Sequence, residues 1–80
     1  MTVTFSKPSR KYLARCEKNI QAAIVGAIER LPDKGDIKPL KGQGVKNAYR
    51  LRVVRYRIIY VREGELVRIV DIDTRGDIYK

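Results

Sequence analysis

The sequence predicts an α+β fold in which an N-terminal strand and a helical hairpin pack on a small antiparallel β-sheet. Between Leu13 and Leu31 apolar residues recur every three or four positions, which is the period of an amphipathic helix. After residue 47 the period changes to two, which is typical of strands with one buried face. The chain has 80 residues, the length of one small domain, so we expect a single domain over residues 1–80.

A short strand is expected at the N-terminus, because Val3 and Phe5 alternate with threonine and serine. Pro8 suits the first turn of a helix, where its missing N–H costs nothing, and Ser6 is a possible cap. We therefore expect a strand that passes directly into a helix.

The helical stretch carries one apolar stripe. A single helix from Ser9 to Leu31 would be roughly 35 Å long at about 1.5 Å per residue, too long for a domain with a radius of gyration of about 12 Å. We predict a break near Glu17–Asn19, with Asn19 able to cap a second helix. The stripe consists of Leu13, Cys16, Ile20, Ala23, Ile24, Ala27, Ile28 and Leu31.

Three consecutive strands are expected after a loop from Asp33 to Asn47. Glu63-Gly64-Glu65 has the composition of a hairpin turn, whereas the link at Val54-Arg55 contains none of the usual turn residues. The runs with β-type alternation are residues 49–53, 56–61 and 66–72.

The chain is strongly basic, with 18 Lys and Arg, nine Asp and Glu and a net charge of +9. A polyanion or an acidic protein is therefore the expected partner. Almost all of the excess lies between Ile37 and Arg62, which contains eight basic residues and no acidic residue. These are Lys38, Lys41, Lys46, Arg50, Arg52, Arg55, Arg57 and Arg62.

Three arginines are expected on one face of the sheet. Because side chains alternate along a strand, Arg50 and Arg52 point away from the apolar residues, and Arg57 joins them if its neighbours face the helices. A solvated sheet face is one explanation. Like charges across strands repel one another, however, and planar guanidinium groups suit phosphate, so a bound anion is the other.

Several classes of function are excluded. The chain has no histidine and one cysteine, so zinc-finger and histidine-based catalytic schemes are ruled out, and we expect no metal and no cofactor. Cys16 lies on the apolar stripe and is expected to be a buried hydrophobe. The apolar runs are too short to cross a membrane and no signal peptide is visible, which predicts a cytoplasmic protein.

The tyrosines of the strands follow the apolar period. Tyr49, Tyr56 and Tyr60 are therefore expected to pack in the core rather than to stack on bases. Tyr79 lies one residue from the end of the sequence, where it is either a frayed tail residue or an aromatic platform beside the basic face.

Four motifs, taken in order, resemble the RelE/ParE superfamily of bacterial type II toxins, and most of all its RelE branch. The resemblance extends over nearly the whole chain and implies a RelE-like fold. The motifs are Leu40-Lys41-Gly42, Tyr49-Arg50-Leu51-Arg52-Val53, Tyr56-Arg57-Ile58-Ile59-Tyr60 and Asp73-Thr74-Arg75-Gly76-Asp77-Ile78-Tyr79.

The resemblance implies a metal-independent endoribonuclease that cleaves messenger RNA on the ribosome and inhibits translation until an acidic, RelB-like antitoxin binds it. The residues that match the catalytic positions of the family are Arg50, Arg52, Arg57, Arg75 and Tyr79. Further contacts to RNA phosphates are expected from Lys38, Lys41, Lys46 and Arg55.

The sequence departs from the pattern of the family at several positions. Arg50 and Arg52 stand where well-known members have lysine, and arginine cannot act as a base because it stays protonated. Thr74 stands where many relatives have histidine. Tyr79 is the best remaining candidate for proton transfer, since neighbouring arginines would favour its phenolate.

Two alternatives to RNA cleavage remain open. ParE-like toxins share the fold and are understood to inhibit DNA gyrase by binding it. The departures from the family pattern are also compatible with a catalytically weak homologue whose role is to bind a partner.

Overall fold

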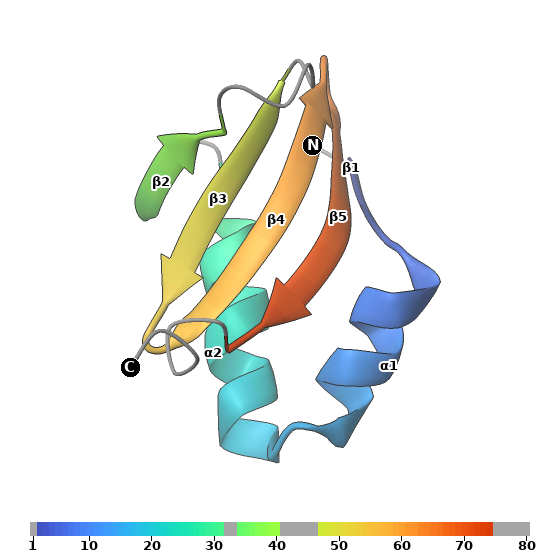
Figure 1. Ribbon diagram of the computed structural model, residues 1–80, viewed down its shortest axis with the longest axis vertical. Coiled ribbons are helices and arrows are strands. Elements are labelled where there is room, and N and C mark those ends of the chain that lie inside the picture. The colour runs from blue at the N-terminus through green and yellow to red at the C-terminus, as the bar shows by residue number, and fades with distance from the viewer. Residues whose placement is uncertain (1, 32–33, 41–46, 75–80) are drawn as a thin grey trace.

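The computed structural model of the protein describes residues 2–31, 34–40 and 47–74. Two helices pack on one face of a five-stranded sheet (Figure 1). The elements in chain order are β1 (Thr2–Phe5), α1 (Lys7–Arg15), α2 (Lys18–Glu29), β2 (Asp36–Pro39), β3 (Ala48–Val53), β4 (Tyr56–Glu63) and β5 (Leu66–Asp73).

The strands are arranged in the order β1-β5-β4-β3-β2, so that β1 and β2 form the two edges (Figure 1). The central hairpins pair antiparallel, as does β2 with β3, whereas β1 pairs parallel with β5. The predicted α+β class and helical hairpin are confirmed. The sheet is mixed rather than purely antiparallel, because the N-terminal strand joins it as a parallel edge strand.

The hydrophobic core lies between α2 and the helix-facing side of the sheet. Ile24 and Ile28 of α2 meet apolar side chains from the three central strands, as the stripe predicts. Ala23 is exposed, contrary to the prediction, because it lies about 100° around the helix from Ile24. The buried sheet residues are Leu51, Ile58, Tyr60, Val67, Ile69 and Ile72.

The start of α1 is fixed by two serines. The Ser6 side chain accepts a hydrogen bond from the Ser9 amide at 3.3 Å, so the predicted cap is confirmed. The Ser9 hydroxyl, which is fully buried, is 3.1 Å from the Ile69 carbonyl oxygen of β5. This contact joins the first helical turn directly to the sheet.

The predicted helix break is confirmed, but it lies slightly earlier and is capped differently. The residue before α2 is Glu17, which makes no side-chain capping bond, and Asn19 lies inside the helix. The Gln21 side-chain amide instead donates to the carbonyl oxygens of Leu13 and Cys16 at 2.8 and 3.1 Å. The capping prediction for Asn19 is therefore wrong, because α2 begins one residue before it. The Gln21 bonds satisfy carbonyl groups at the end of α1 instead.

The predicted loop from Asp33 to Asn47 contains a strand, β2, at Asp36–Pro39. Only Ile37 of this strand packs against the core, opposite Leu51 of β3. The pattern is therefore too short to give a period of two. Pro39 is tolerated because an edge strand does not need every backbone N–H for pairing.

The first residue of each hairpin turn has a positive φ, but its identity differs between the two turns. The turn between β4 and β5 begins with Gly64 at φ 59°, whereas the turn between β3 and β4 begins with Val54 at φ 57°. A β-branched residue in this left-handed region is strained, while glycine adopts it freely. Val54 is 76% exposed, so packing does not compensate the strain.

Replacing Val54 by glycine is therefore expected to stabilise the protein. Relief of the left-handed strain, worth about 1–2 kcal/mol, should exceed the added chain entropy of glycine, worth about 0.5–1 kcal/mol. Thermal unfolding should show a melting temperature raised by a few degrees for Val54→Gly.

The matched control is Gly64→Val, which places the strained residue in the other turn. A Cβ at Gly64 would meet no atom within 4 Å, so the substitution changes backbone strain without creating a clash. It should lower the melting temperature. Equal melting temperatures for all three proteins would contradict the strain at Val54.

Candidate functional site

Two rows of mostly charged side chains cross the face of the sheet opposite the helices. Residues paired in register project to the same side of the sheet, and these rows alternate with the buried row that contains Leu51, Ile58 and Ile72. The first row consists of Asp36, Arg52, Arg57 and Asp73, and the second of Lys38, Arg50, Ile59 and Asp71.

The three arginines share one face, as predicted. Arg52 of β3 lies directly opposite Arg57 of β4, and Arg50 lies in the neighbouring row, two residues along β3. Directly opposed like charges destabilise a sheet. The arrangement is therefore one that an anion on this face would relieve, and the planar guanidinium forks match the oxygens of a phosphate.

Carboxylates flank the arginine cluster on both sides, although the basic segment from Ile37 to Arg62 itself contains none. Asp36 pairs in register with Arg52, and its Oδ1 lies 3.5 Å from Nη2 of Arg50. On the other side of the cluster, Asp73 of β5 pairs with Arg57. The contact of Asp36 with the cluster was not predicted, because Asp36 lies one residue before the basic segment. It also belongs to a stretch that the sequence predicts to be a loop rather than a strand.

The arginines differ in how firmly they are held. The Arg50 side chain is only 13% exposed, whereas its partner Asp36 is 56% exposed. Arg57 is half-buried and Arg52 is exposed. Arg50 thus forms a fixed part of the face, and Arg52 is open to a ligand.

The other predicted phosphate contacts fall into two groups. Lys38 is exposed on β2 and lies opposite Arg50, so it extends the basic face toward the edge of the sheet. Arg55 is exposed in the turn between β3 and β4. The remaining predicted site residues lie outside the described part of the chain: Lys41, Lys46, Arg75 and Tyr79.

The tyrosines of the strands lie on the helix side of the sheet, so their predicted packing role is correct. The rings of Tyr49 and Tyr60 stack with centroids 5.4 Å apart, and Tyr12 of α1 meets Tyr56 edge to face at 6.4 Å. Burial raises the pKa of Tyr60 and of Tyr12 above the ordinary tyrosine value. These two hydroxyls therefore keep their protons at neutral pH.

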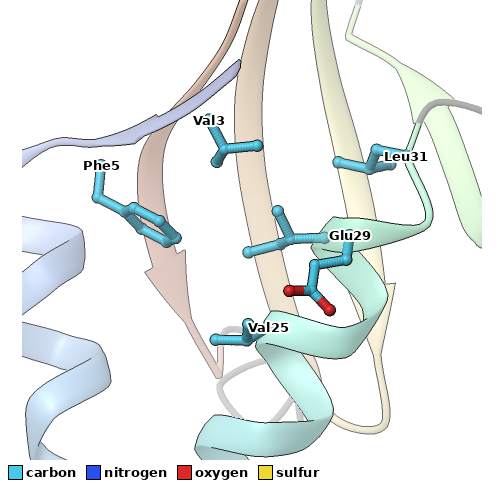
Figure 2. A pocket seen from close by; sticks show the side chains of 6 residues that line it. Val3, Phe5, Val25, Glu29 and Leu31 are labelled. Carbon is cyan, nitrogen blue, oxygen red and sulfur yellow. The ribbon is translucent and has the colours of Figure 1, made fainter. Parts of the chain in front are cut away.

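Among the hollows that the described residues form, two lie beside the helices. The larger, of about 500 Å³, is formed by β1 and α2 and is apolar except for Glu29, as Figure 2 shows; Val3 and Phe5 line its other wall. The smaller, of about 390 Å³, lies by the link between the helices and contains Cys16. Burial raises the pKa of the Cys16 thiol, which makes it a poor nucleophile.

Two further features of the described residues bear on function. Within residues 2–31, 34–40 and 47–74, no helix is long and apolar enough to cross a membrane. The same residues contain no cluster of three Asp, Glu or Cys side chains placed to hold a metal ion.

The family of the protein follows from its sequence over nearly its whole length. Residues 3–79 match the family model described as the ParE toxin of the type II toxin-antitoxin system, parDE. The chain belongs to this family. It is therefore a type II toxin of the RelE/ParE superfamily, as the ordered motifs indicate.

Solved structures of RelE proteins are similar to this toxin. The RelE–RelB complexes of Methanococcus jannaschii and Pyrococcus horikoshii contain chains that are 32% and 26% identical, with TM-scores of 0.71 and 0.76. The alignments cover 94% of the toxin in both cases, and 93% and 94% of those chains. The RelBE2 complex of Mycobacterium tuberculosis has a chain that is 29% identical, with a TM-score of 0.72 over 90% of the toxin and 94% of that chain. No curated protein matches the sequence.

Proposed function

We propose that the toxin is a metal-independent endoribonuclease that cleaves ribosome-bound messenger RNA and so inhibits translation. The observation that carries this proposal is the opposed pair Arg52 and Arg57, with Arg50 beside it, on the sheet face opposite the helices. Opposed arginine forks can bind the oxygens of one phosphate from two sides. An RNA chain supplies such phosphates at regular spacing.

The proposed reaction uses the RNA's own 2′-hydroxyl as the nucleophile. Its oxygen attacks the adjacent phosphorus, the bond to the 5′-oxygen of the next nucleotide breaks, and a 2′,3′-cyclic phosphate remains. The protein has two tasks in such a reaction: to align the sugar with the phosphate and to stabilise the charge that develops on the phosphate oxygens.

The charged rows divide these tasks among their residues. Arg52 and Arg57 hold the scissile phosphate, while the less exposed Arg50 contributes positive charge from a fixed position. Lys38 and Arg55 contact flanking phosphates. Arg75 and Tyr79 complete the site through the matches that the family resemblance implies. Lys41 and Lys46 bind further RNA phosphates as members of the basic segment.

Inhibition of DNA gyrase is a second candidate function. It is favoured by the description of the matching family as a ParE toxin. Such inhibition requires a binding surface and no chemistry. In that case the arginine face would bind a protein or DNA rather than a scissile RNA phosphate.

Translation-dependent cleavage of messenger RNA is the expected activity. After induction of the toxin in growing cells, primer extension should show new messenger ends at codons occupied by ribosomes. Blocking translation should abolish these ends. Intact messengers together with gyrase-linked DNA breaks would instead support the ParE-like function.

Arg57 is expected to be the least replaceable side chain of the site. Arg57→Ala should lower the rate of cleavage by about 10²-fold or more, the scale of losing one donor to the transition state. Arg57→Lys should restore only part of the rate, since an ammonium group cannot reproduce the fork. Single-turnover cleavage of ribosome-bound messenger measures both effects.

The matched control for Arg57 is Arg62→Ala. Arg62 is an exposed arginine on the same strand, five residues away, near the opposite end of the sheet. Both variants should keep the circular dichroism spectrum of the native protein. If folded Arg57→Ala cleaves at the native rate, this residue does not act on the reaction.

We also propose that an acidic, RelB-like antitoxin binds this toxin. Two observations support the proposal: the net charge of +9, and the similarity of the chain to RelE in solved RelB–RelE complexes. Charge complementarity speeds association and makes it sensitive to salt. Titration with the acidic product of the neighbouring gene should give a tight complex that weakens as salt rises, and no binding at low salt would contradict the proposal.

A further inference from the structure

The arginine face raises the question of which group removes the proton from the attacking hydroxyl. Arginine remains protonated in proteins, and the chain contains no histidine. Tyr12, Tyr49, Tyr56 and Tyr60 lie on the helix side of the sheet, and Tyr79, the candidate that the sequence offers for proton transfer, lies outside the described residues. Among the described residues of the two charged rows, the proton acceptors are therefore carboxylates. They are Asp36, Asp71 and Asp73.

Asp36 is the carboxylate whose surroundings best suit this task. Its Oδ1 contacts Nη2 of Arg50 at 3.5 Å, and it lies in register beside Arg52. At 56% exposure it remains accessible to a bound sugar. Asp73 is half-buried, and Asp71 lies opposite Ile59 rather than opposite an arginine.

The spacing of the strands favours the same choice. Side chains in register on neighbouring strands are about 5 Å apart, so a phosphate held between Arg52 and Arg57 lies over β3 and β4. An RNA chain that crosses the strands toward the β2 edge places the ribose on one side of that phosphate over β2 and β3, where Asp36 projects. Its 2′-hydroxyl is within reach of the carboxylate.

We propose that Asp36 is the general base of the cleavage reaction, an assignment that rests on the proposed endoribonuclease function. The carboxylate takes the proton of the 2′-hydroxyl as the bond from that oxygen to phosphorus forms. The bond from phosphorus to the 5′-oxygen breaks, and this leaving oxygen takes a proton from water. Asp36 then returns its proton to solvent, so the products are a 2′,3′-cyclic phosphate and a 5′-hydroxyl.

A purely electrostatic role for Asp36 predicts effects of the opposite sign. If the carboxylate only neutralises Arg50 and Arg52, its removal raises the positive charge of the face. RNA would then bind more tightly, and the phosphate would be better stabilised during cleavage. The sign of the change in rate therefore separates the two roles.

The test is single-turnover cleavage of ribosome-bound messenger by variants at this position. Asp36→Asn should lower the rate by about 10²-fold or more, the usual contribution of a general base. The affinity for RNA should stay the same or increase. Glu63→Gln is the matched control, since it removes an equal charge from an exposed position of β4 outside the two charged rows, and it should cleave at nearly the native rate.

Asp36→His adds a readout that depends on proton transfer. A histidine base should give a rate that rises with pH through about 6.5, the ordinary pKa of an imidazole. Asp36→Glu should retain much of the activity. If Asp36→Asn does not fold, the pH dependence of Asp36→His still tests whether the residue at position 36 takes the proton.

Two results would overturn the assignment in distinguishable ways. A native protein that cleaves, together with an Asp36→Asn variant that cleaves as fast or faster, would leave the proposed function intact and make Asp36 a counter-ion. A folded native protein that cleaves no messenger would contradict the endoribonuclease function itself. The assignment of Asp36 as general base would then fail as well.

Discussion

The register between β3 and β4 is the constraint on which the rest of the structure depends. It places Leu51 opposite Ile58 on the helix side and Arg52 opposite Arg57 on the other side. Because side chains alternate along a strand, a slip of one residue would expose the two fully buried residues and bury the arginines. Core packing and the arginine face are therefore set by the same pairing.

This pairing explains how the sheet tolerates an unfavourable charge arrangement. Two opposed arginines repel each other, and burial of the apolar row beside them supplies the opposing free energy. Carboxylates on both sides of the pair, Asp36 and Asp73, reduce the repulsion without removing it. A face with residual positive charge remains available to an anion.

The sheet also separates structural from chemical tasks. The helices, the tyrosine pairs and both hollows lie on one side, while the charged rows lie on the other. Substitutions among the exposed charges are for this reason expected to change activity with little change in stability. The ion pair of Asp36 with Arg50 connects the edge strand β2 to β3 on the charged side.

Much of this arrangement follows from local patterns in the sequence. The alternation after residue 47 is strong enough to give the three long strands and the shared face of the arginines. The edge strand β2 could not be predicted in the same way, since Ile37 is its one core residue and Pro39 suggests a loop. Because this strand could not be predicted, the position of Asp36 beside the arginines could not be predicted either.

Other features depend on contacts between distant parts of the chain. The parallel pairing of β1 with β5 joins residues more than 60 positions apart, and nothing near Val3 indicates it. The carbonyl groups at the end of α1 accept hydrogen bonds from Gln21, a side chain that no capping pattern identifies in the sequence. The roles of Arg75 and Tyr79 remain predictions from the family resemblance.

The most direct test of the account is to map RNA binding on the isotope-labelled protein by NMR, with a short single-stranded RNA as the ligand. The guanidinium resonances of Arg50, Arg52 and Arg57 should shift on titration, and the shifts should weaken as salt rises. Methyl resonances of Val3 and Val25 in the hollow on the helix side should stay unchanged. Shifts confined to that hollow, with the three arginines unaffected, would contradict a phosphate site on this face.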